Sequence, residues 1–489
     1  MPKQKSIKKN FIMNAILTMS QFIFPLITFP YVSRILLPAG TGRVSFAISV
    51  ITYFTMFSQL GIPTYGIRKC AQVRDDKMKL TRVTHELFFI NFTMNILAYV
   101  ILFFCIAFIP RLQADRTLYL VVSLNIIFTC VGIDWMYQGL EEYTYITVRS
   151  IVFKFIALVA MFLFIHHKSD YVIYGGISIF AASASNVLNL INARKHIYMH
   201  PVGGYCIWRH LKPILVFFAM SVATTVYTNL DTVMLGFMKN NTEVGYYNAA
   251  VKIKTILVSI VTSLGAVLLP RASYYVEQGD YEDLRRISSK ALNFVLDIAC
   301  PLALYFILFA KEGIRLLSGP AYGGAVLPMQ WIQPTILFIG LTNILGLQIL
   351  VPLGKEKYVL YSEIAGAIVD FVINWFLIPK LGSTGASIGT LAAEFVVLVV
   401  QYHVLRDQVS GIFKKLPYGK IVLALGLATL ASLWVKRLGL HVFFVLVISV
   451  ILFMGVYVLV LTFTKEPMML EMVGTVRSKL GSVRNKSKQ

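Results

Sequence analysis

The stretch FIMNAILTMSQFIFPLITFPYVS, residues 11–33, decides the fold of this chain. It contains no charged side chain. A helix rises about 1.5 Å per residue, so about 20 apolar residues cross the roughly 30 Å hydrocarbon core of a bilayer. Because a helix also satisfies its own backbone groups, as lipid requires, the stretch predicts a membrane-spanning helix.

The same pattern recurs along nearly the whole sequence. We predict fourteen spans with short polar connections: 11–33, 44–62, 84–109, 117–138, 145–166, 171–192, 213–237, 247–269, 287–310, 326–351, 360–378, 384–404, 418–435 and 440–463. The expected fold is an all-α integral membrane protein with about fourteen transmembrane helices. Almost no residues remain for a soluble catalytic domain, and no nucleotide-binding or hydrolase motif is present, so most enzyme classes are excluded.

The positive charge of the chain is explained by where it lies. The 489 residues are 57% hydrophobic and 14% charged, with a formal net charge of +22. Lys and Arg lie mainly between the spans, where they suit anionic membrane lipids, so no nucleic-acid partner is expected. The five cysteines lack the spacing of a metal site or a disulfide framework, and we expect neither a metal nor a cofactor.

The loop charges also predict the orientation. With the N-terminus in the cytoplasm, cytoplasmic segments hold roughly three times as many Lys and Arg as outer segments. This bias predicts that both termini are cytoplasmic, which requires an even number of spans. The basic start MPKQKSIKKN precedes an apolar run too long for a signal-peptide core, so we interpret that run as the first span rather than a cleaved signal.

Two hairpins far apart in the sequence are alike. SRILLPAGTGRVSFAIS (33–49) and DTVMLGFMKNNTEVGYYNAAVK (231–252) each carry a Gly five residues before an Ala, namely Gly42 and Gly245. LIPKLGSTGASIGTLAAEF (377–395) is a related small-residue hairpin. Small residues let helices approach closely in lipid. The spacing of the first two predicts parallel repeats of six spans each, a known transporter plan.

These repeats predict the domain organisation. We expect an N-terminal lobe at 1–205 and a second lobe at 206–411, related by a pseudo-two-fold axis. Residues 412–489 then hold the last two helices and a basic cytoplasmic tail. The apolar residues of that tail have helical spacing, which suits an amphipathic helix on an anionic surface, although a disordered tail fits equally. They are Met469, Val473, Val476, Leu480 and Val483.

The opening of the chain resembles that of the oligosaccharide flippases, the polysaccharide biosynthesis protein family. The matching segment is NFIMNAILTMSQFIFPLITFPYVSRILLPAGTGRVSFAISVITYFTMFSQLGIPTYGIR (10–68), with its two prolines, the SRIL run and LGIPTYGIR. Further matches are NLDTVMLGFMKNNTEVGYYNAAVKI (229–253), LPRAS (269–273), PLGKEKYV (352–359) and INWFLIPKLGSTGASIGTLAAE (373–394). The family belongs to the multidrug/oligosaccharidyl-lipid/polysaccharide exporter superfamily, so the resemblance implies two six-helix lobes around a V-shaped cavity.

The resemblance also implies a function. Such a protein would carry an undecaprenyl-diphosphate-linked oligosaccharide repeat unit from the cytoplasmic to the outer leaflet of a bacterial inner membrane, for O-antigen, capsule or exopolysaccharide. A polysaccharide polymerase and a chain-length regulator are the protein partners that the resemblance implies. A monomer is mechanistically sufficient, because both lobes lie on one chain.

Cationic side chains in or near spans are the expected ligands of the diphosphate: Arg34, Lys154, Lys252 and Lys254. Arg34 lies near the end of its span, so extension to the outer headgroups is its alternative role. Lys252 and Lys254 point about 200° from each other on a helix, so at most one can face a given cavity wall. Lys252 has Asp231 as an alternative partner, and Lys154 has Asp134.

Acids within spans are the expected coupling or gating groups: Asp231, Asp297, Asp370 and Glu394. The last three fall near the middle of their spans, where an ionisable group indicates proton or sodium coupling by default. A protonated or hydrogen-bonded carboxyl that joins helices is the open alternative for each. Asp231 falls in the NLDTVML segment that carries the resemblance.

Prolines and amides complete the candidate set. Pro25 and Pro30 are expected to kink the first span, either as a bending gate or as a static feature. Amides that could hydrogen-bond sugars, or merely join helices, are Asn14, Gln21, Asn229 and Gln348.

Four alternatives to this function are considered. A drug or metabolite antiporter of the same superfamily is the nearest one. Flippases of the peptidoglycan lipid precursor have a more arginine-rich first span, whereas Arg34 is the only charge in and directly after the first span of this chain. A membrane-embedded polymerase or ligase would need a large outer catalytic loop, and no outer loop here is long enough. A structural scaffold explains none of the matched segments.

Overall fold

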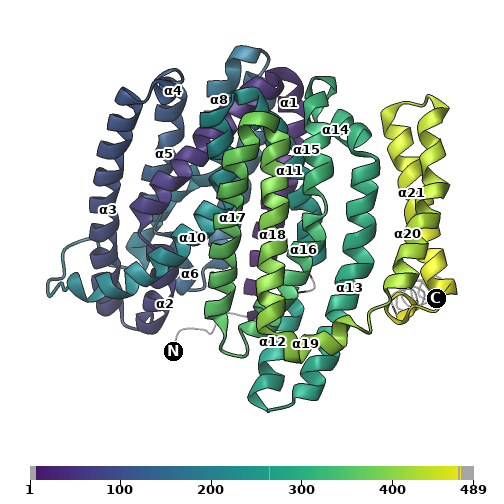
Figure 1. The fold of residues 1–489 in the computed structure, drawn as a ribbon. Helices are drawn as coiled ribbons and strands as arrows, with labels where there is room; N and C mark the ends of the chain where they lie inside the picture. Colours follow the sequence, from purple (N-terminus) through teal and green to yellow (C-terminus); the bar gives the residue numbers. More distant parts are fainter. Residues whose placement is uncertain (1–6, 264, 472–473, 475–489) are drawn as a thin grey trace, which may run out of the picture. The chain divides into compact units, whose positions relative to one another are not determined.

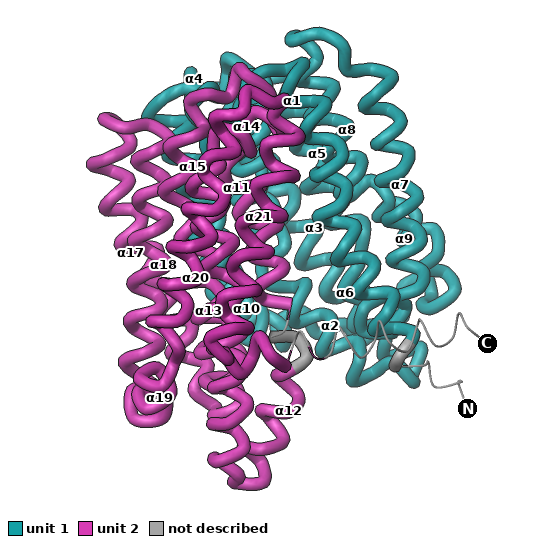
Figure 2. Tube along the Cα trace, turned by 90° about the vertical axis from the view of Figure 1, so that its right-hand side faces the viewer, with its two compact units in different colours: residues 1–248 teal, residues 249–489 magenta. Residues whose placement is uncertain are grey.

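The computed structural model describes residues 7–263, 265–471 and 474, and within these ranges the chain forms helices and no strand (Figure 1). It divides into two compact units, residues 1–248 and 249–489 (Figure 2). Of the predicted amphipathic tail, only Met469 lies inside the described residues. The lobes predicted at 1–205 and 206–411 rest on the internal repeat and stay a prediction.

Unit 1 is built around α1. Its elements are α1 (Ile7–Gln59), α2 (Ile62–Val73), α3 (Lys77–Phe108), α4 (Pro110–Gln113), α5 (Arg116–Gly132), α6 (Asp134–Gly139), α7 (Tyr143–Phe164), η1 (Lys168–Asp170), α8 (Tyr171–Ser183), η2 (Ala184–Asn186), α9 (Val187–Asn192), η3 (Ala193–Lys195), α10 (Trp208–Met238) and the start of α11 (Asn241–Thr262). Helix α1 packs against α3, α5, α7, α8 and α10. Because α10 also packs against α2, it belongs to this unit.

The break in α1 has a local cause. Leu37 has φ 58° and ψ 176°, which ends one helical segment and starts the next between the predicted spans 11–33 and 44–62. Pro38 follows directly and cannot donate a backbone hydrogen bond. Pro25 and Pro30 lie inside the first segment, as the sequence indicates, and the helix continues through both.

Unit 2 contains two helical hairpins, α17–α18 and α20–α21. Its elements are the rest of α11, α12 (Gly265–Glu277), α13 (Tyr281–Leu308), α14 (Ala310–Ser318), η4 (Pro320–Ala325), α15 (Val326–Ile332), α16 (Thr335–Thr342), the π-helix η5 (Asn343–Leu350), α17 (Glu356–Leu381), α18 (Ser383–Val404), α19 (Arg406–Phe413), α20 (Tyr418–Leu433), η6 (Trp434–Leu438) and α21 (Val442–Phe463). The predicted span 326–351 is not one straight helix, since Pro320–Ile332 and Thr335–Leu350 meet at 43°.

The described ranges contain eleven helices long and apolar enough to cross a membrane, or up to twelve if the bent pair counts as one span. Two features account for the difference from the fourteen predicted. The stretch Lys9–Val73 is counted once although Leu37 divides α1 into two segments, and α5 is shorter than a typical span. Large apolar side chains such as Phe108, Phe155 and Phe463 are exposed on helix surfaces, as expected where lipid is the solvent. The exact number of crossings and the side of each terminus stay predictions.

Candidate functional site

The candidates on α1 lie along an accessible surface. Arg34 is exposed, and its guanidinium donates a hydrogen bond to the carbonyl oxygen of Pro30, one turn earlier. Asn14 and Gln21 are also exposed and lie two helical turns apart, on one face of α1. The first segment of α1 therefore presents amide groups on one face, and its Arg34 donates to the backbone of the preceding turn.

Lys154 is brought to the same helix from α7. Its ammonium group donates a hydrogen bond of 2.7 Å to the hydroxyl of Ser20, the residue before Gln21. Asp134, the alternative partner considered from the sequence, binds Arg149 at 2.8 Å and the amide of Asn189 at 2.7 Å. Lys154 is thus held beside α1 by a neutral hydroxyl and not by Asp134.

Asp231 lies where α10 approaches α11. Its carboxylate is buried and accepts a hydrogen bond from the hydroxyl of Tyr247. Asn229 is half-buried, and its side-chain amide donates to the carbonyl of Thr225 at 3.2 Å and to the hydroxyl of Thr228 at 3.0 Å, both on its own helix. Asp231 and Tyr247 together tie the two helices on either side of the predicted outer hairpin.

Lys252 and Lys254 follow on α11. Both are half-buried, and their spacing turns them toward different sides of the helix, as expected. Lys252 and Lys254 lie in unit 2, whereas Arg34 and Lys154 lie in unit 1.

Asp370 and Asn374 lie one turn apart on α17 and face α18. Both are buried, and their side-chain oxygens pack against Gly389, where a Cβ would overlap them. The hairpin is antiparallel, so Glu394 on α18, also buried, lies at about the level of Asp370. The α17–α18 hairpin therefore collects two of the four predicted acids and one amide in a space that only a glycine leaves open.

Gln348 lies in the π-helix η5, a conformation that is often found at functional sites. It is buried, and its side-chain nitrogen has no hydrogen-bond partner within the described residues. Nearby in the fold of unit 2, Gln401 packs against Gly346 of η5 and donates a hydrogen bond of 3.0 Å to Ser362 of α17. The polar interior of unit 2 therefore extends from α17–α18 to η5.

The fourth acid, Asp297 on α13, lies apart from this hairpin. It is fully buried and lies beside Glu466, which follows the end of α21. The sequence places Asp297 near the middle of the predicted span 287–310. Its carboxyl group nevertheless lies at the end of the neighbouring helix α21, beside Glu466.

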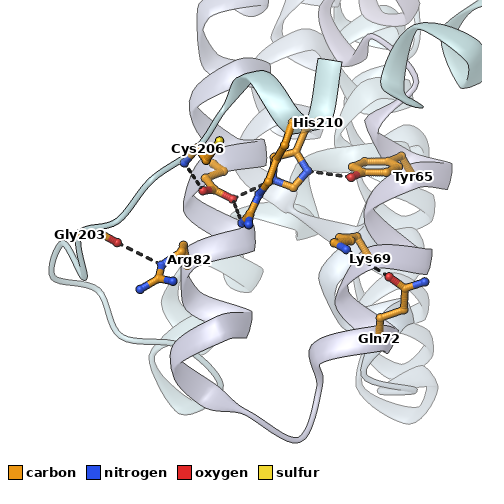
Figure 3. A network of polar contacts seen from close by, with 9 residues as sticks. Tyr65, Lys69, Gln72, Arg82, Gly203, Cys206 and His210 are labelled. Atoms are coloured by element: carbon orange, nitrogen blue, oxygen red, sulfur yellow. Dashed lines mark hydrogen bonds and ion pairs between the residues drawn. The ribbon is translucent and has the colours of Figure 1, made fainter. Parts of the chain in front are cut away.

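Sequence reasoning missed the strongest polar network of unit 1 (Figure 3). Glu86 of α3 is fully buried and accepts hydrogen bonds from the guanidinium of Arg209 at 2.6 Å and from the backbone N–H of Cys206 at 2.6 Å. Its carboxylate also lies 2.7 Å from His210 Nε2, and the other ring nitrogen of His210 lies 2.7 Å from the hydroxyl of Tyr65. One carboxylate thus joins α3, α10 and α2.

A second missed feature is the close packing of the two glycine hairpins. A Cβ on Gly42 would overlap the carbonyl of Asn241, and a Cβ on Gly245 would overlap the carbonyl of Pro38. Arg111 holds the α10–α11 turn from the side, with hydrogen bonds of 2.8 Å to the carbonyl of Gly236 and 2.5 Å to Asn241. The sequence identified both hairpins as related, but gave no sign that they touch.

The site therefore consists of several polar regions and no single reaction centre. No group of three or more His, Cys, Asp or Glu side chains able to hold a metal ion occurs in the described part of the chain. Its chemistry is that of hydrogen-bonding and charged groups inside membrane-spanning helices, where such groups are candidates for a functional role.

Comparison with known proteins identifies the family. The family described as "Polysaccharide biosynthesis protein" matches residues 7–276, more than half of the chain. The chain belongs to this family. A second family, MatE, matches residues 217–376.

Curated relatives of this polysaccharide biosynthesis family member are transporters and flippases rather than enzymes. The "Putative O-antigen transporter" of Escherichia coli is 24% identical over 407 residues, which cover 82% of this chain and 97% of that protein. "Lipid II flippase MurJ" of Bacillus subtilis is 26% identical over 196 residues, covering 38% of this chain and 34% of the relative.

Solved structures confirm the fold class. "Lipid II flippase MurJ, inward closed conformation" matches with a TM-score of 0.72 at 16% identity and covers 93% of this chain and 99% of its own. An inward-facing "multidrug resistance MATE family transporter of the MOP superfamily" matches with a TM-score of 0.61 at 13% identity, covering 83% and 99%. The family member described here is a multi-pass helical membrane protein with a transporter fold.

Proposed function

We propose that this protein is a flippase that moves an undecaprenyl-diphosphate-linked oligosaccharide repeat unit from the cytoplasmic to the outer leaflet of a bacterial inner membrane, by alternating access, for surface polysaccharide synthesis. The observation that carries the proposal is the family match over residues 7–276, joined to an alignment over 97% of an E. coli protein named "Putative O-antigen transporter". The same pathway supplies the proposed partners, a polymerase and a chain-length regulator.

The chemistry of the substrate fits the polar groups inside the spans. Sugar hydroxyls and a diphosphate are very poorly soluble in hydrocarbon, so a carrier must offer hydrogen bonds and positive charge while the isoprenoid tail stays in lipid. We assign the diphosphate to cations among Arg34, Lys154, Lys252 and Lys254. The amides of Asn14, Gln21, Asn229 and Gln348 are the proposed sugar contacts.

Two sources of energy are available to such a carrier. A membrane potential, negative inside, favours outward movement of an anion by about 2.3 kcal/mol per charge for each 100 mV. The buried acids Asp231, Asp370 and Glu394 are the proposed ion-coupling groups that reset the empty carrier, since their burial among helices matches what coupling requires.

The glycine hairpins are the proposed outer gate. Both are predicted to lie at the outer surface, and they pack backbone to backbone at Gly42 and Gly245. Outward release would require them to separate, with Pro25 and Pro30 as the bending points of α1. A side chain at Gly245 would disturb the closed packing, whereas Gly426 has open space around it and tolerates one.

The test is the sidedness of lipid-linked repeat units after deletion of the gene in its host. We expect complete units to accumulate in the inner leaflet, protected in intact spheroplasts from an added glycosidase. The wild-type gene and Gly426→Ala should restore export, and Gly245→Ala should reduce it at an equal membrane level of protein. Units exposed outside but unpolymerised would contradict the proposal and indicate a polymerase or ligase.

A second candidate is a drug or metabolite antiporter, which the MatE match over residues 217–376 favours. An unchanged pool of lipid-linked units, together with sensitivity of the deletion strain to small toxic cations, would select this function instead.

A further inference from the structure

A buried group of oxygen atoms lies between α13 and the residues that follow α21. Asp297 and Glu466 are both fully buried, and their carboxyl groups lie side by side. Glu466 accepts hydrogen bonds from the side-chain amide of Asn293 at 2.6 Å and from the backbone N–H of Met469 at 2.5 Å. Neither oxygen of Asp297 has a hydrogen-bond donor within the described residues.

Two more buried oxygens face the same place. The hydroxyl of Tyr457 on α21 lies close enough to both carboxyl groups to feel their charge, and the side-chain oxygen of Asn293 lies one turn before Asp297 on α13. Within the described ranges, neither oxygen has a hydrogen-bond partner. The two carboxyl groups therefore lie among buried oxygens, and Asp297 accepts a hydrogen bond from no described donor.

The electrostatics of this arrangement require a proton or a cation. Two ionised carboxylates side by side in a buried site repel each other and lose their hydration, each at a cost of several kcal/mol. No ion pair among the described residues involves Asp297 or Glu466. A single proton shared by the two carboxyl groups removes one charge and provides the missing donor, as in other buried carboxyl pairs.

A cavity open to the protein surface reaches one member of the pair. It has a volume of about 470 Å³, and its lining includes Asn293 and Glu466, whereas Asp297 lies one helical turn further along α13. The charged groups around it are Lys290 of α13, paired with Glu471 at 3.0 Å, Lys415 after α19, and Lys420 of α20, which donates to the carbonyl of Lys465. This basic rim disfavours entry of a metal cation, whereas a proton can pass along water.

We propose that Asp297 and Glu466 form a proton-binding site that fastens α13 to the end of α21, loaded from water in the adjacent cavity. Binding adds one proton to one carboxylate, which then donates a hydrogen bond to the other; release returns the proton to water. The contacts that define the site involve Asn293, Met469 and Glu466 and no group assigned to the transported substrate.

The first test compares thermal unfolding of the purified protein at pH 5 and pH 9. Unfolded carboxyl groups ionise near pH 4, so a pair that keeps its proton when folded loses stability as the pH rises above that value. The unfolding midpoint of the wild type should therefore be lower at pH 9 than at pH 5. This drop should exceed the drop of Asp297→Asn, which mimics the protonated acid, by about 3 °C or more. Glu471→Gln, on the exposed rim, should behave as the wild type. An equal change in unfolding midpoint between pH 5 and pH 9 for the wild type and Asp297→Asn would overturn the proposal.

The second test reads the proton directly. Infrared difference spectra should show the C=O stretching band of a protonated carboxyl at neutral pH in the wild type and in Glu471→Gln. Asp297→Asn and Glu466→Gln should lack it, and two variants keep the test valid if one fails to fold. Absence of the band in the wild type, or a midpoint that Na⁺ raises at constant pH in the wild type but not in Asp297→Asn, would overturn the proton assignment.

Discussion

The two units treat their buried polar groups differently. In unit 1, buried charges are cross-linked: Glu86 binds Arg209 and His210, and Arg149 binds Asp134, although the Nε of Arg149 has no partner within the described residues. In unit 2, the ion pairs lie at the surface or near it, for example Lys290 with Glu471 and Arg286 with Asp283. Several buried side chains of unit 2 instead carry polar atoms without a hydrogen-bond partner in the described ranges: Asp297, Gln333, Gln348 and Tyr457.

This difference separates two uses of polarity inside a membrane protein. Fully paired groups fix helices to one another, because removing either partner leaves the other unsatisfied in a medium without water. Incompletely paired groups stabilise nothing as they stand, and they are available to a proton, a water molecule or a solute. The comparison predicts that replacing a buried polar residue destabilises unit 1, and that some replacements of buried polar residues stabilise unit 2.

The largest effect is expected at Glu86. Glu86→Ala leaves the buried His210 ring and the N–H of Cys206 without their acceptor, whereas the Arg209 side chain is 45% exposed and regains water, so we expect a loss of about 3 kcal/mol. The measurement is the thermal midpoint and the monodisperse fraction in detergent. Glu86→Gln should lie between the wild type and Ala, and Glu282→Ala, at an exposed position, is the control. A midpoint for Glu86→Ala close to that control would show that the network does not stabilise unit 1.

A second cross-link is expected to give a smaller loss. Arg149→Met removes the ion pair with Asp134, at 2.8 Å, and the hydrogen bond to the carbonyl of Ser185, at 2.9 Å. Asp134 is partly exposed and keeps Asn189, so we expect about 2 kcal/mol rather than the full value for a buried pair. Chemical denaturation in mixed micelles measures it. A larger loss than for Glu86→Ala would reverse the ranking of the two networks.

Gln333 sharpens the comparison with an effect of the opposite sign. It is buried at the break between α15 and α16, and neither polar atom of its side-chain amide has a partner within the described residues. Replacing an unsatisfied amide by an apolar group of similar size is expected to stabilise by about 1 kcal/mol. Gln333→Leu should thus raise the thermal midpoint. A clear decrease would mean that the amide has a solvent or solute partner.

The smallest effect is expected at the surface of unit 2. Lys290 and Glu471 are 3.0 Å apart, and both side chains are 59% exposed. Because solvent screens the two charges, such a pair contributes about 0–1 kcal/mol to the free energy of unfolding. Lys290→Gln should change the midpoint by less than any substitution above, and the change should disappear at high salt. A salt-resistant loss would place Lys290 among the structural cross-links.

The helices themselves were predictable where a long apolar run is closed by turn residues. The predicted span 384–404 corresponds to Ser383–Val404, and 440–463 to Val442–Phe463. The break near Gln333 was missed, because an average over about 20 residues does not register one amide and one proline inside an apolar segment. The merged α1 shows the reverse case, since the sequence separates two spans that the helix joins.

The candidate groups were predictable only one at a time. Asp231, Asp370 and Glu394 are buried, as an acid within an apolar span indicates. Their partners were not predictable, because Tyr247, Asn374 and Gly389 carry no signal of their own. Glu86 was overlooked since it lies at the edge of its predicted span, and its partners are more than 120 residues away. The nearest available signal was the adjacent Arg209 and His210, just before the start of another span.

The five cysteines have a practical consequence. All lie within the described ranges, and Cys206 is the exposed one. The backbone N–H of Cys206 donates the hydrogen bond to Glu86. Its loop is predicted to be cytoplasmic, whereas the half-buried Cys105 lies toward the predicted outer end of α3. Cys300 is half-buried as well, so in a background with both Cys105→Ser and Cys300→Ser a bulky impermeant maleimide would tag inverted vesicles and spare intact cells. The native thiol thus makes the molecule its own reporter of orientation, and any loosening around Glu86 would appear as a faster tagging rate.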